Sequence, residues 1–334
     1  MLKLVGRIAR LAIGALILVV LLHLFVGLPE TPSLHRWKWI PEGENRPIYG
    51  STSDDGCPPF TGLERVVITV KTGATEASQR IPIQMKTSLR CAPHVYVFSD
   101  MAQKIGDVEL HDVLDETADH IKDGNPAFEI YRKQQELQDP EKIVNQLKSF
   151  KTPGSGELAA WTLDKYKNMH LLEKAWALKP DMDWYLHIDA DTYVVLPNLV
   201  EWLKRLDKKN DLYLGRMIPT DGKTFAHGGS GILLSGEAMR IFAVDHNGTA
   251  ARWDPKVDTS CCGDILLSRA LAENGIGPVM NSWPTINGES LNTIPFGDDH
   301  WCQPVVTMHH VSAEEMKEIA NFEMRRPDKT VCLS

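Results

Sequence analysis

The sequence predicts an α/β fold: an open, mostly parallel sheet with helices on both faces. Short β-branched runs have the character of buried strands, and helical stretches separate them. The composition is that of a globular protein, with 43% hydrophobic and 24% charged residues. The 334-residue chain has a formal net charge of -8, which disfavours a nucleic-acid-binding protein because such proteins present a basic face.

The first predicted elements make a βαβ unit. Residues 66–70 predict a buried strand, residues 76–89 a helix, and residues 94–98 a second strand that ends in Ser99 and Asp100. Two strands separated by a helix favour a parallel sheet.

The later elements continue the alternation. The pattern predicts a long helix over residues 157–178, a strand over 184–188 that breaks at Asp189, and helices over 197–206, 262–274 and 313–323. Ligands of open α/β sheets bind outside the carboxyl ends of the strands. This rule selects Lys71, Thr72, Asp100, Asp189 and Asp191 as candidate functional residues.

The N-terminal segment predicts a membrane anchor. Residues 11–28 carry no formal charge, and at about 1.5 Å per residue they are just long enough to cross a bilayer. Basic residues before the span predict a cytoplasmic N-terminus. We therefore expect a tail (1–10), a single transmembrane signal-anchor (11–28), a stem (29–60) and a luminal domain (61–334). A cleaved secretory signal is the alternative, although the apolar run is long for one.

All six cysteines follow the predicted span. In an oxidising compartment they permit three disulfides, whose pairing the sequence leaves open. Cys261 and Cys262 are adjacent, and from ordinary disulfide geometry we expect them not to pair with each other. Asn247 lies in the chain's glycosylation sequon and predicts a luminal surface loop.

Asp189 and Asp191 form the most informative pattern. Their i, i+2 spacing at the end of a hydrophobic strand points both carboxylates to one side of the chain. Such a pair is repulsive unless a cation lies between the acids or one is protonated. Mg²⁺ or Mn²⁺ resolves the conflict and keeps coordination sites for phosphate oxygens of a substrate. The alternative interpretation is a solvated turn in which Asp is an ordinary turn residue.

A strand followed by two spaced aspartates also begins the phosphoryl-transfer motif of haloacid dehalogenase-like phosphohydrolases. That motif has Thr or Val two residues after the second Asp, whereas this chain has Tyr193. The predicted luminal topology is also unusual for that family. Phosphohydrolysis therefore stays a rival hypothesis.

Six motifs in order resemble the fringe and core-1 β-1,3-glycosyltransferase family of single-anchor Golgi enzymes, in particular its fungal members. The motifs are Lys71-Thr72 with Arg80, Ser99-Asp100, residues 187–194, the Gly-rich residues 225–231, Gly263-Asp264-Ile265, and residues 307–311 with two histidines. The resemblance implies a GT-A fold, which is Rossmann-like, a UDP-sugar donor, Mn²⁺ with Mg²⁺ as the alternative ion, and inversion at the sugar carbon.

The resemblance also assigns roles. The metal site is expected to contain Asp189, Asp191 and His309, with His310 as the alternative histidine. Asp191 binds the ion directly in this prediction, and Asp189 contacts metal-bound water or the ribose hydroxyls. Asp264 is the expected general base, although an acid at a helix start also stabilises the helix dipole. The chain departs from the family here, because Cys262 and Gly263 precede a single acid. The remaining assignments are donor-binding Lys71, Thr72, Arg80, Asp100, Lys167 and Ala190, and acceptor-binding Gly228, Gly229, Ser230 and Trp301.

Taken together, the sequence predicts a metal-dependent inverting glycosyltransferase in the Golgi or ER membrane. It is expected to move a hexose or N-acetylhexosamine from a UDP-sugar to a glycan or glycoprotein, with a β-1,3 linkage. The alternative from another functional class is an inactive luminal glycan-binding protein on the same fold, because fold alone does not guarantee turnover.

Overall fold

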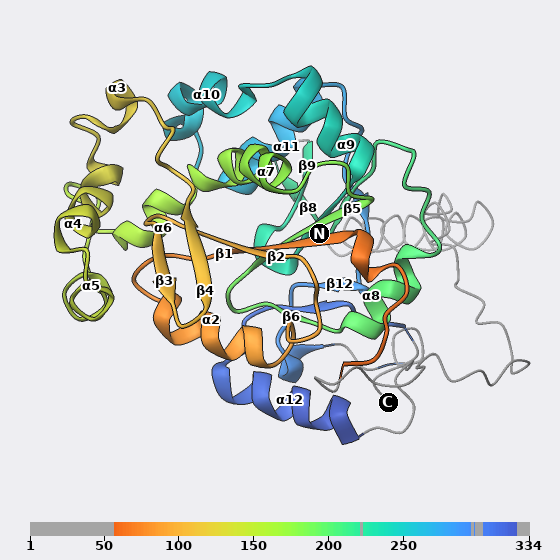
Figure 1. The fold of residues 1–334 in the computed structure, drawn as a ribbon. Coiled ribbons are helices and arrows are strands. Elements are labelled where there is room, and N and C mark those ends of the chain that lie inside the picture. Colours follow the sequence, from red (N-terminus) through yellow and green to blue (C-terminus); the bar gives the residue numbers. More distant parts are fainter. Residues whose placement is uncertain (1–56, 221–222, 295–296, 298–302, 326–334) are drawn as a thin grey trace, which may run out of the picture. The chain divides into compact units, whose positions relative to one another are not determined.

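The computed structural model describes residues 57–220, 223–294, 297 and 303–325. An eight-stranded sheet runs through this part of the chain (Figure 1). Its strands, in spatial order, are β11 (Met280–Asn281), β7 (Tyr213–Gly215), β10 (Ile232–Ser235), β5 (Trp184–Asp189), β1 (Val66–Lys71), β2 (Val95–Ser99), β4 (Val108–Asp112) and β3 (Gln103–Ile105).

The sheet is mixed, with a parallel centre. Strand β1 pairs in parallel with β5 and β2, and β2 with β4. Strand β10 runs antiparallel between β5 and β7, and β3 is antiparallel at the other edge. The predicted βαβ unit and the mostly parallel α/β class are confirmed.

Two smaller sheets complete the strands. One contains β12 (Ile286–Asn287), β13 (Thr307–Met308) and β6 (Tyr193–Val194), and the other is the hairpin of β8 (Met217–Thr220) and β9 (Lys223–Ala226). The first is important for the site because β13 is antiparallel to β6, which directly follows the two aspartates of β5. Residues far apart in sequence thus become neighbours.

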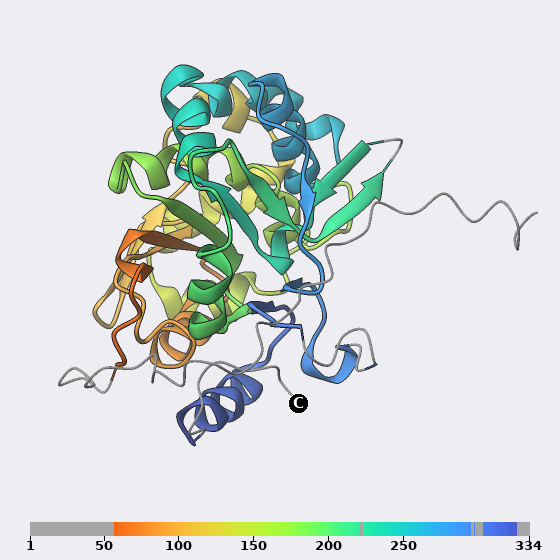
Figure 2. The ribbon, with the colours of Figure 1, turned by 90° about the vertical axis from the view of Figure 1, so that its right-hand side faces the viewer.

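Helices cover both faces of the main sheet, as predicted. On one face lie α2 (Ala77–Lys86) and α8 (Leu196–Leu203), and α12 (Ala313–Arg325) packs against α2. On the other face lie α4 (Glu129–Leu137), α5 (Pro140–Leu147), α6 (Ala159–Asp164), α7 (Lys167–Leu178), α9 (Gly236–Arg240), α10 (Thr249–Trp253) and α11 (Gly263–Glu273). Figure 2 shows α12, in blue, below the sheet.

Short helices occupy the connections. They are η1 (Leu63–Arg65), α3 (Asp119–Lys122), η2 (Pro126–Phe128), η3 (Gly228–Ser230), the π-helix η4 (Ile241–Asp245), η5 (Asp254–Thr259) and η6 (Leu291–Thr293).

Alternation along β1 explains the two cores. Val67 points to the core that contains α7 and α11, whereas Ile68 and Val70 point to the core that contains α2 and α8. Successive side chains of a strand face opposite sides of a sheet, so a strand buried on both faces has a continuous apolar sequence. The parallel centre directs the carboxyl ends of β1, β2 and β5 to one edge.

The predicted helix over residues 157–178 is two helices, α6 and α7, with a break at Lys165 and Tyr166. Asp164 and Lys167, on either side of the break, form an ion pair with an oxygen–nitrogen distance of 3.4 Å. Among the described residues, no helix has the length and apolar character needed to cross a bilayer. The predicted tail, anchor and most of the stem lie outside them.

Candidate active site

The two aspartates of the metal motif lie at the end of the central strand β5. In the parallel register of β1 and β5, Lys71 is the partner of Asp189. The amide of Ala190 donates to the carbonyl of Lys71 (3.0 Å), and the amide of Thr192 donates to the carbonyl of Asp189 (3.0 Å). This turn carries the chain from β5 to β6 and leaves Asp189 and Asp191 half-buried at the sheet edge.

Asp191 lies beside both C-terminal histidines. His309 Nε2 is 3.3 Å from Asp191 Oδ1, and His310 Nδ1 is 3.6 Å from Asp191 Oδ2. Pairing of β13 with β6 brings these residues together, and the amide of Val311 donates to the carbonyl of Asp191 (2.9 Å). Asp191, His309 and His310 therefore form a group whose ligand atoms are close enough to share one metal ion.

The residues of this group fit a divalent cation. The Nδ1 atom of His309 is buried, without a hydrogen-bond partner among the described residues. Carboxylate oxygen and imidazole nitrogen together suit Mn²⁺ and related ions, whereas Ca²⁺ prefers oxygen alone. Both histidines reach Asp191, so the structure retains His310 beside the predicted His309. Asp189 lies outside the group and forms an ion pair with Lys71, with a distance of 3.5 Å between Oδ1 and Nζ.

The two aspartates differ in their electrostatics. Burial raises the pKa of Asp189, and the nearby Asp164 and Asp191 raise it further against the opposing charge of Lys71. Burial also acts on Asp191, but its hydrogen bond to His309 and the charges of His309 and Arg80 outweigh burial, so the pKa of Asp191 lies below its ordinary value. The pKa values of the two acids in the motif are therefore shifted in opposite directions.

The Gly-rich segment of η3 joins the metal group to Asp264. A Cβ atom at Gly229 would lie under 3.0 Å from three atoms of the His309 ring, so the backbone packs directly on the imidazole. Thr192 Oγ1 donates to the carbonyl of Gly229 (2.7 Å). At the preceding residue, the amide of Gly228 donates to Asp264 Oδ2 (3.1 Å). The candidate base and the metal group thus contact neighbouring residues of one short segment.

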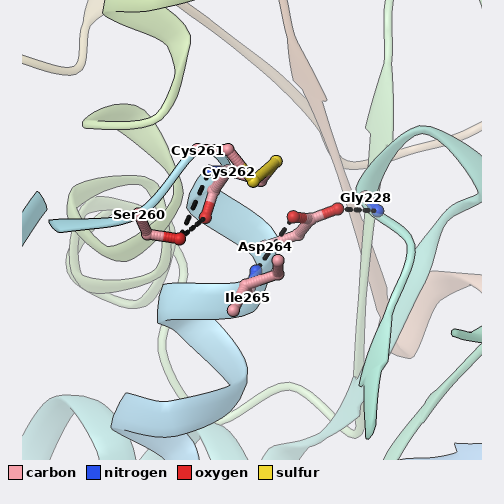
Figure 3. The surroundings of a disulfide bond; sticks show 6 residues. All are labelled: Gly228, Ser260, Cys261, Cys262, Asp264 and Ile265. Carbon is pink, nitrogen blue, oxygen red and sulfur yellow. Dashed lines mark hydrogen bonds between the residues drawn. A yellow bond between two sulfur atoms is a disulfide. The ribbon is translucent and has the colours of Figure 1, made fainter. Parts of the chain in front are cut away.

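Asp264 lies in the first turn of α11 (Figure 3). Its carboxylate accepts hydrogen bonds from the amides of Ile265 (2.9 Å) and Gly228. Gly263 before it has no room for a side chain, because a Cβ atom would lie 2.6 Å from the carbonyl oxygen of Lys165. The start of α11 is therefore packed against the junction of α6 and α7. This packing fixes the position of the Asp264 backbone. Its two predicted roles, as base and as helix-start acid, are both compatible with this position.

The prediction that Cys261 and Cys262 do not pair is wrong. The structure contains a disulfide between these adjacent residues (Figure 3) and a second one between Cys57 and Cys91. The prediction applied the usual Cα separation of disulfides, about 4.4–6.8 Å, whereas adjacent residues are held 3.8 Å apart by the intervening peptide unit. The disulfide between Cys261 and Cys262 therefore forms at a Cα separation below the range that disulfides usually have.

The predicted donor-binding residues differ in burial. An inner set, Thr72, Asp100 and Lys167, is buried, and an outer set, Lys71 and Arg80, is half-buried. Asp100 and Lys167 are buried and contact each other at 3.2 Å, and Lys167 also donates to the carbonyl of Thr72 (2.9 Å). Thr72 is buried, and its hydroxyl has no hydrogen-bond partner among the described residues. Asp100 and Lys167 therefore support the loop after β1 from within. Direct contact of Asp100 or Lys167 with a ligand requires that they become accessible.

Lys71 and Arg80 form the outer set and are half-buried. Lys71 contacts both Asp164 and Asp189. Arg80 Nη1 donates to the carbonyl of Val311 (3.3 Å), directly after the two histidines. Arg80 therefore supports the metal group rather than standing as a free surface charge.

Sequence reasoning missed Asp164 and His227. Asp164 binds Lys71 and Lys167 together, and its only signal was a position three residues before Lys167 on a predicted helix. His227 lies within the Gly-rich residues 225–231, directly before η3; its Nδ1 atom is 2.7 Å from Ser230 Oγ, and its ring centroid is 5.4 Å from that of His309.

Two predicted sites remain, Trp301 and Asn247. Trp301 lies outside the described residues. Asn247 is exposed, in the turn between η4 and α10, as expected for a glycosylation acceptor.

Comparison with known proteins gives matches to glycosyltransferases. A family model described as Fringe-like matches residues 61–253, more than half of the chain. Chondroitin sulfate glucuronyltransferase from Homo sapiens is 36% identical over 93 residues, which make up 27% of this chain and only 10% of that protein.

Two solved structures are similar at low identity. A glycosyltransferase involved in the glycosylation of the major capsid of PBCV-1 is 12% identical, with a TM-score of 0.38 over 77% of this chain and 99% of that one. The galactosyltransferase LgtC, in complex with donor and acceptor sugar analogs, is 13% identical, with a TM-score of 0.40 over 78% of this chain and 98% of that one.

Proposed function

Because the chain belongs to the Fringe-like family and is a glycosyltransferase, we propose that it is a metal-dependent, inverting enzyme of the GT-A type. Its donor is a UDP-sugar that carries a hexose or N-acetylhexosamine. Its acceptor is a glycan or glycoprotein, and the bond formed is a β-1,3 linkage.

One observation carries this proposal. Gly228 binds Asp264, and the next residue, Gly229, packs on His309 of the Asp191 group. An inverting transferase needs a site for the donor diphosphate and a base on the opposite side of the sugar carbon. A metal group and an acid that contact adjacent residues of one short segment support an arrangement of this kind.

Asp191, His309 and His310 are the residues that would hold Mn²⁺ or Mg²⁺. When bound, the ion supplies Lewis-acid stabilisation of the negative charge that develops on the departing diphosphate. The chain's own contribution is to orient these ligands: Arg80 holds the backbone at Val311, and Gly229 supports the His309 ring.

Asp264 is the proposed general base. Its carboxylate takes the proton from the acceptor hydroxyl as that oxygen forms a bond to the anomeric carbon, and the bond from this carbon to the diphosphate oxygen breaks. The hydrogen bonds from Gly228 and Ile265 fix the orientation of the carboxylate. Positioned acids and bases of this kind contribute about 10²–10⁴-fold to a rate.

Lys71, Thr72 and Arg80, with Ala190 and Asp189 at the end of β5, are proposed to surround the UDP moiety, and Asp100 and Lys167 to support them from within. Gly228, Gly229 and Ser230 face the acceptor side in this proposal, where Trp301 is a further candidate. The small residues allow the backbone to approach a sugar closely.

For the cellular location we propose the lumen of the Golgi or ER, with residues 11–28 as a single anchor. The disulfide between Cys57 and Cys91 supports an oxidising compartment. An endoglycosidase-sensitive mass shift that disappears in Asn247→Gln tests this topology, and an unglycosylated, protease-accessible chain in intact microsomes contradicts it.

The function is tested by incubating the purified chain with a panel of UDP-sugars, with and without Mn²⁺, and measuring UDP release and transfer. We expect turnover with one donor class, and its loss in EDTA and in Asp191→Ala. Absence of turnover with every donor, despite metal-dependent binding of UDP, favours the glycan-binding alternative. Release of phosphate from a phosphomonoester, lost in Asp189→Asn, favours the phosphohydrolase alternative.

A further inference from the structure

A cluster of charged residues lies beside the end of β1. Lys71 and Lys167 are the two cations, and Asp100, Asp164 and Asp189 are the three acids. The side chain of Lys167 is 1% exposed and that of Asp100 is fully buried. Water stabilises the charges of Lys167 and Asp100 little, so both depend on their pairing with one another and with their neighbours.

Asp164 bridges the two lysines. One carboxylate oxygen contacts Lys71 Nζ, and the other is 3.4 Å from Lys167 Nζ. Lys167 is itself fixed by Asp100 and by the carbonyl of Thr72. The last residue of α6 is therefore anchored to the loop after β1, and its carboxylate has little freedom to leave Lys71.

Lys71 has two acids within reach. It is the register partner of Asp189 on the neighbouring strand, so the backbone itself places the two side chains together. Its Nζ atom nevertheless lies closer to Asp164 than to Asp189, which is 3.5 Å away. A lysine ammonium on a flexible four-carbon stem takes the position that its partners dictate. Asp164 thus competes with Asp189 for the charge of Lys71.

The electrostatics agree with this geometry. Burial alone lowers the pKa of Lys71, but Asp164 and then Asp189 outweigh it and raise the pKa above its ordinary value. Burial raises the pKa of Asp164, whereas Lys71 and Lys167 together bring it below its ordinary value. Both groups are therefore charged at neutral pH.

We propose that Asp164 is a positioning residue that shares the Lys71 ammonium with Asp189, and so limits the ion pair between Lys71 and Asp189 and keeps the Asp189 carboxylate available to the metal and donor site. The inference rests on the proposed function, since Asp189 needs this freedom only if it serves such a site. In the absence of Asp164, Lys71 closes onto Asp189 and neutralises it.

The experiment measures binding of Mn²⁺ alone to the 334-residue chain, from the electron paramagnetic resonance signal of free Mn²⁺. Omitting the nucleotide separates this effect from any contact of Lys71 with a diphosphate. We expect Asp164→Asn to weaken Mn²⁺ binding about tenfold, at the lower end of what loss of a residue behind a metal ligand costs. Asp164→Glu, which keeps the charge, is expected to recover most of the affinity.

The decisive comparison is the double variant Lys71→Met, Asp164→Asn. If Asp164 acts through Lys71, Asp164→Asn has no further effect in the Lys71→Met background. A direct long-range attraction between Asp164 and the ion predicts the same loss in both backgrounds, and that result overturns the proposal. Lys71→Met alone is expected to bind Mn²⁺ at least as tightly as the wild type, and weaker binding overturns the proposal even if Asp164→Asn does not fold.

Asp258→Asn is the matched control, because Asp258 pairs with Lys165 at 2.9 Å in the same region and does not contact Lys71 or Asp189. It is expected to bind Mn²⁺ as the wild type does. A wild-type chain that binds no Mn²⁺ overturns the metal-dependent function and this inference with it. Normal binding by the wild type and by Asp164→Asn overturns the inference alone.

Discussion

Gly229 packs its backbone against the imidazole ring of His309, so closely that a Cβ atom on the glycine would lie under 3.0 Å from three ring atoms. The contact joins two segments that are eighty positions apart in sequence. Its requirement for glycine is steric, because the φ angle of Gly229 is not among the positive ones. The ring of His309 can take its position beside Asp191 only because residue 229 has no Cβ atom.

Gly229→Ala is therefore expected to displace His309 and weaken the metal group. The atoms nearest to the added methyl group belong to the buried imidazole ring of His309, which cannot move aside as the end of a flexible side chain could. We expect Mn²⁺ affinity and sugar transfer to fall about 10–100-fold, measured by spin resonance and by UDP release. Gly277→Ala is the control, because a Cβ atom there would meet no atom within 4 Å. Equal effects of the two substitutions would contradict a specific role for Gly229.

Asp264→Asn tests the proposed base. Asparagine keeps the size of the side chain and an oxygen that accepts the hydrogen bond from Gly228, but it does not take up the acceptor's proton. We expect donor affinity to change little and the transfer rate to fall about 10²–10⁴-fold. The measurement is a rate under saturating donor, together with calorimetric binding of UDP. Normal transfer by this variant would mean that another residue is the base.

The fold followed from the sequence where patterns are local. Residues 66–70 form a β-branched run and residues 184–188 a mostly apolar one, both typical of a strand buried on both faces, and both are central strands. The break between α6 and α7 was not predictable, because the residues around it are compatible with a helix. At the break, Asp164 pairs with Lys71 of β1, and Lys167 donates to the carbonyl of Thr72 directly after β1, which are long-range contacts that no local pattern contains.

The site was predictable to a similar extent. The juxtaposition of Asp191 with His309 followed from a resemblance over ordered motifs, and the structure brings the two together. The burial of Lys167 and the bridging role of Asp164 did not follow, because a lone charge in a sequence does not reveal its partner. The disulfide between Cys261 and Cys262 was missed for another reason: the geometric rule applied to it describes residues that are distant in sequence.

The two disulfides are expected to differ in their effect on stability. Cys57 and Cys91 are 34 positions apart, so their bond restricts a long loop of the unfolded chain, a contribution of about 4 kcal/mol in the chain-entropy model. Cys57→Ser should lower the free energy of unfolding by nearly that amount without altering the transfer rate of the folded enzyme. The Cys261→Ala, Cys262→Ala variant should cost much less stability, since one peptide unit already joins the pair. Denaturant titration with a transfer assay tests both, and a larger loss from the second variant would contradict the loop argument.

Asp183 gives a pH dependence of stability that is independent of the active site. Burial raises its pKa, but hydrogen bonds from Lys208 (2.5 Å) and Arg65 (3.1 Å) outweigh burial and bring the pKa below its ordinary value. The native state thus binds fewer protons than the unfolded state, and the stabilisation is complete above the unfolded pKa of about 3.9 and is lost as the pH falls through the lower native value.

Asp183→Asn is therefore expected to lower the free energy of unfolding by about 1 kcal/mol at pH 6, as partly exposed ion pairs do, and to cost little near pH 2. The comparison is made by denaturant titration at the two pH values. Asp211→Asn, an exposed acid that precedes β7, controls for the change in net charge. A cost of Asp183→Asn that is the same at both pH values would show that the side chain acts through packing and neutral hydrogen bonds. A cost that declines towards low pH, beside a flat control, assigns the difference to the charged pairs with Arg65 and Lys208.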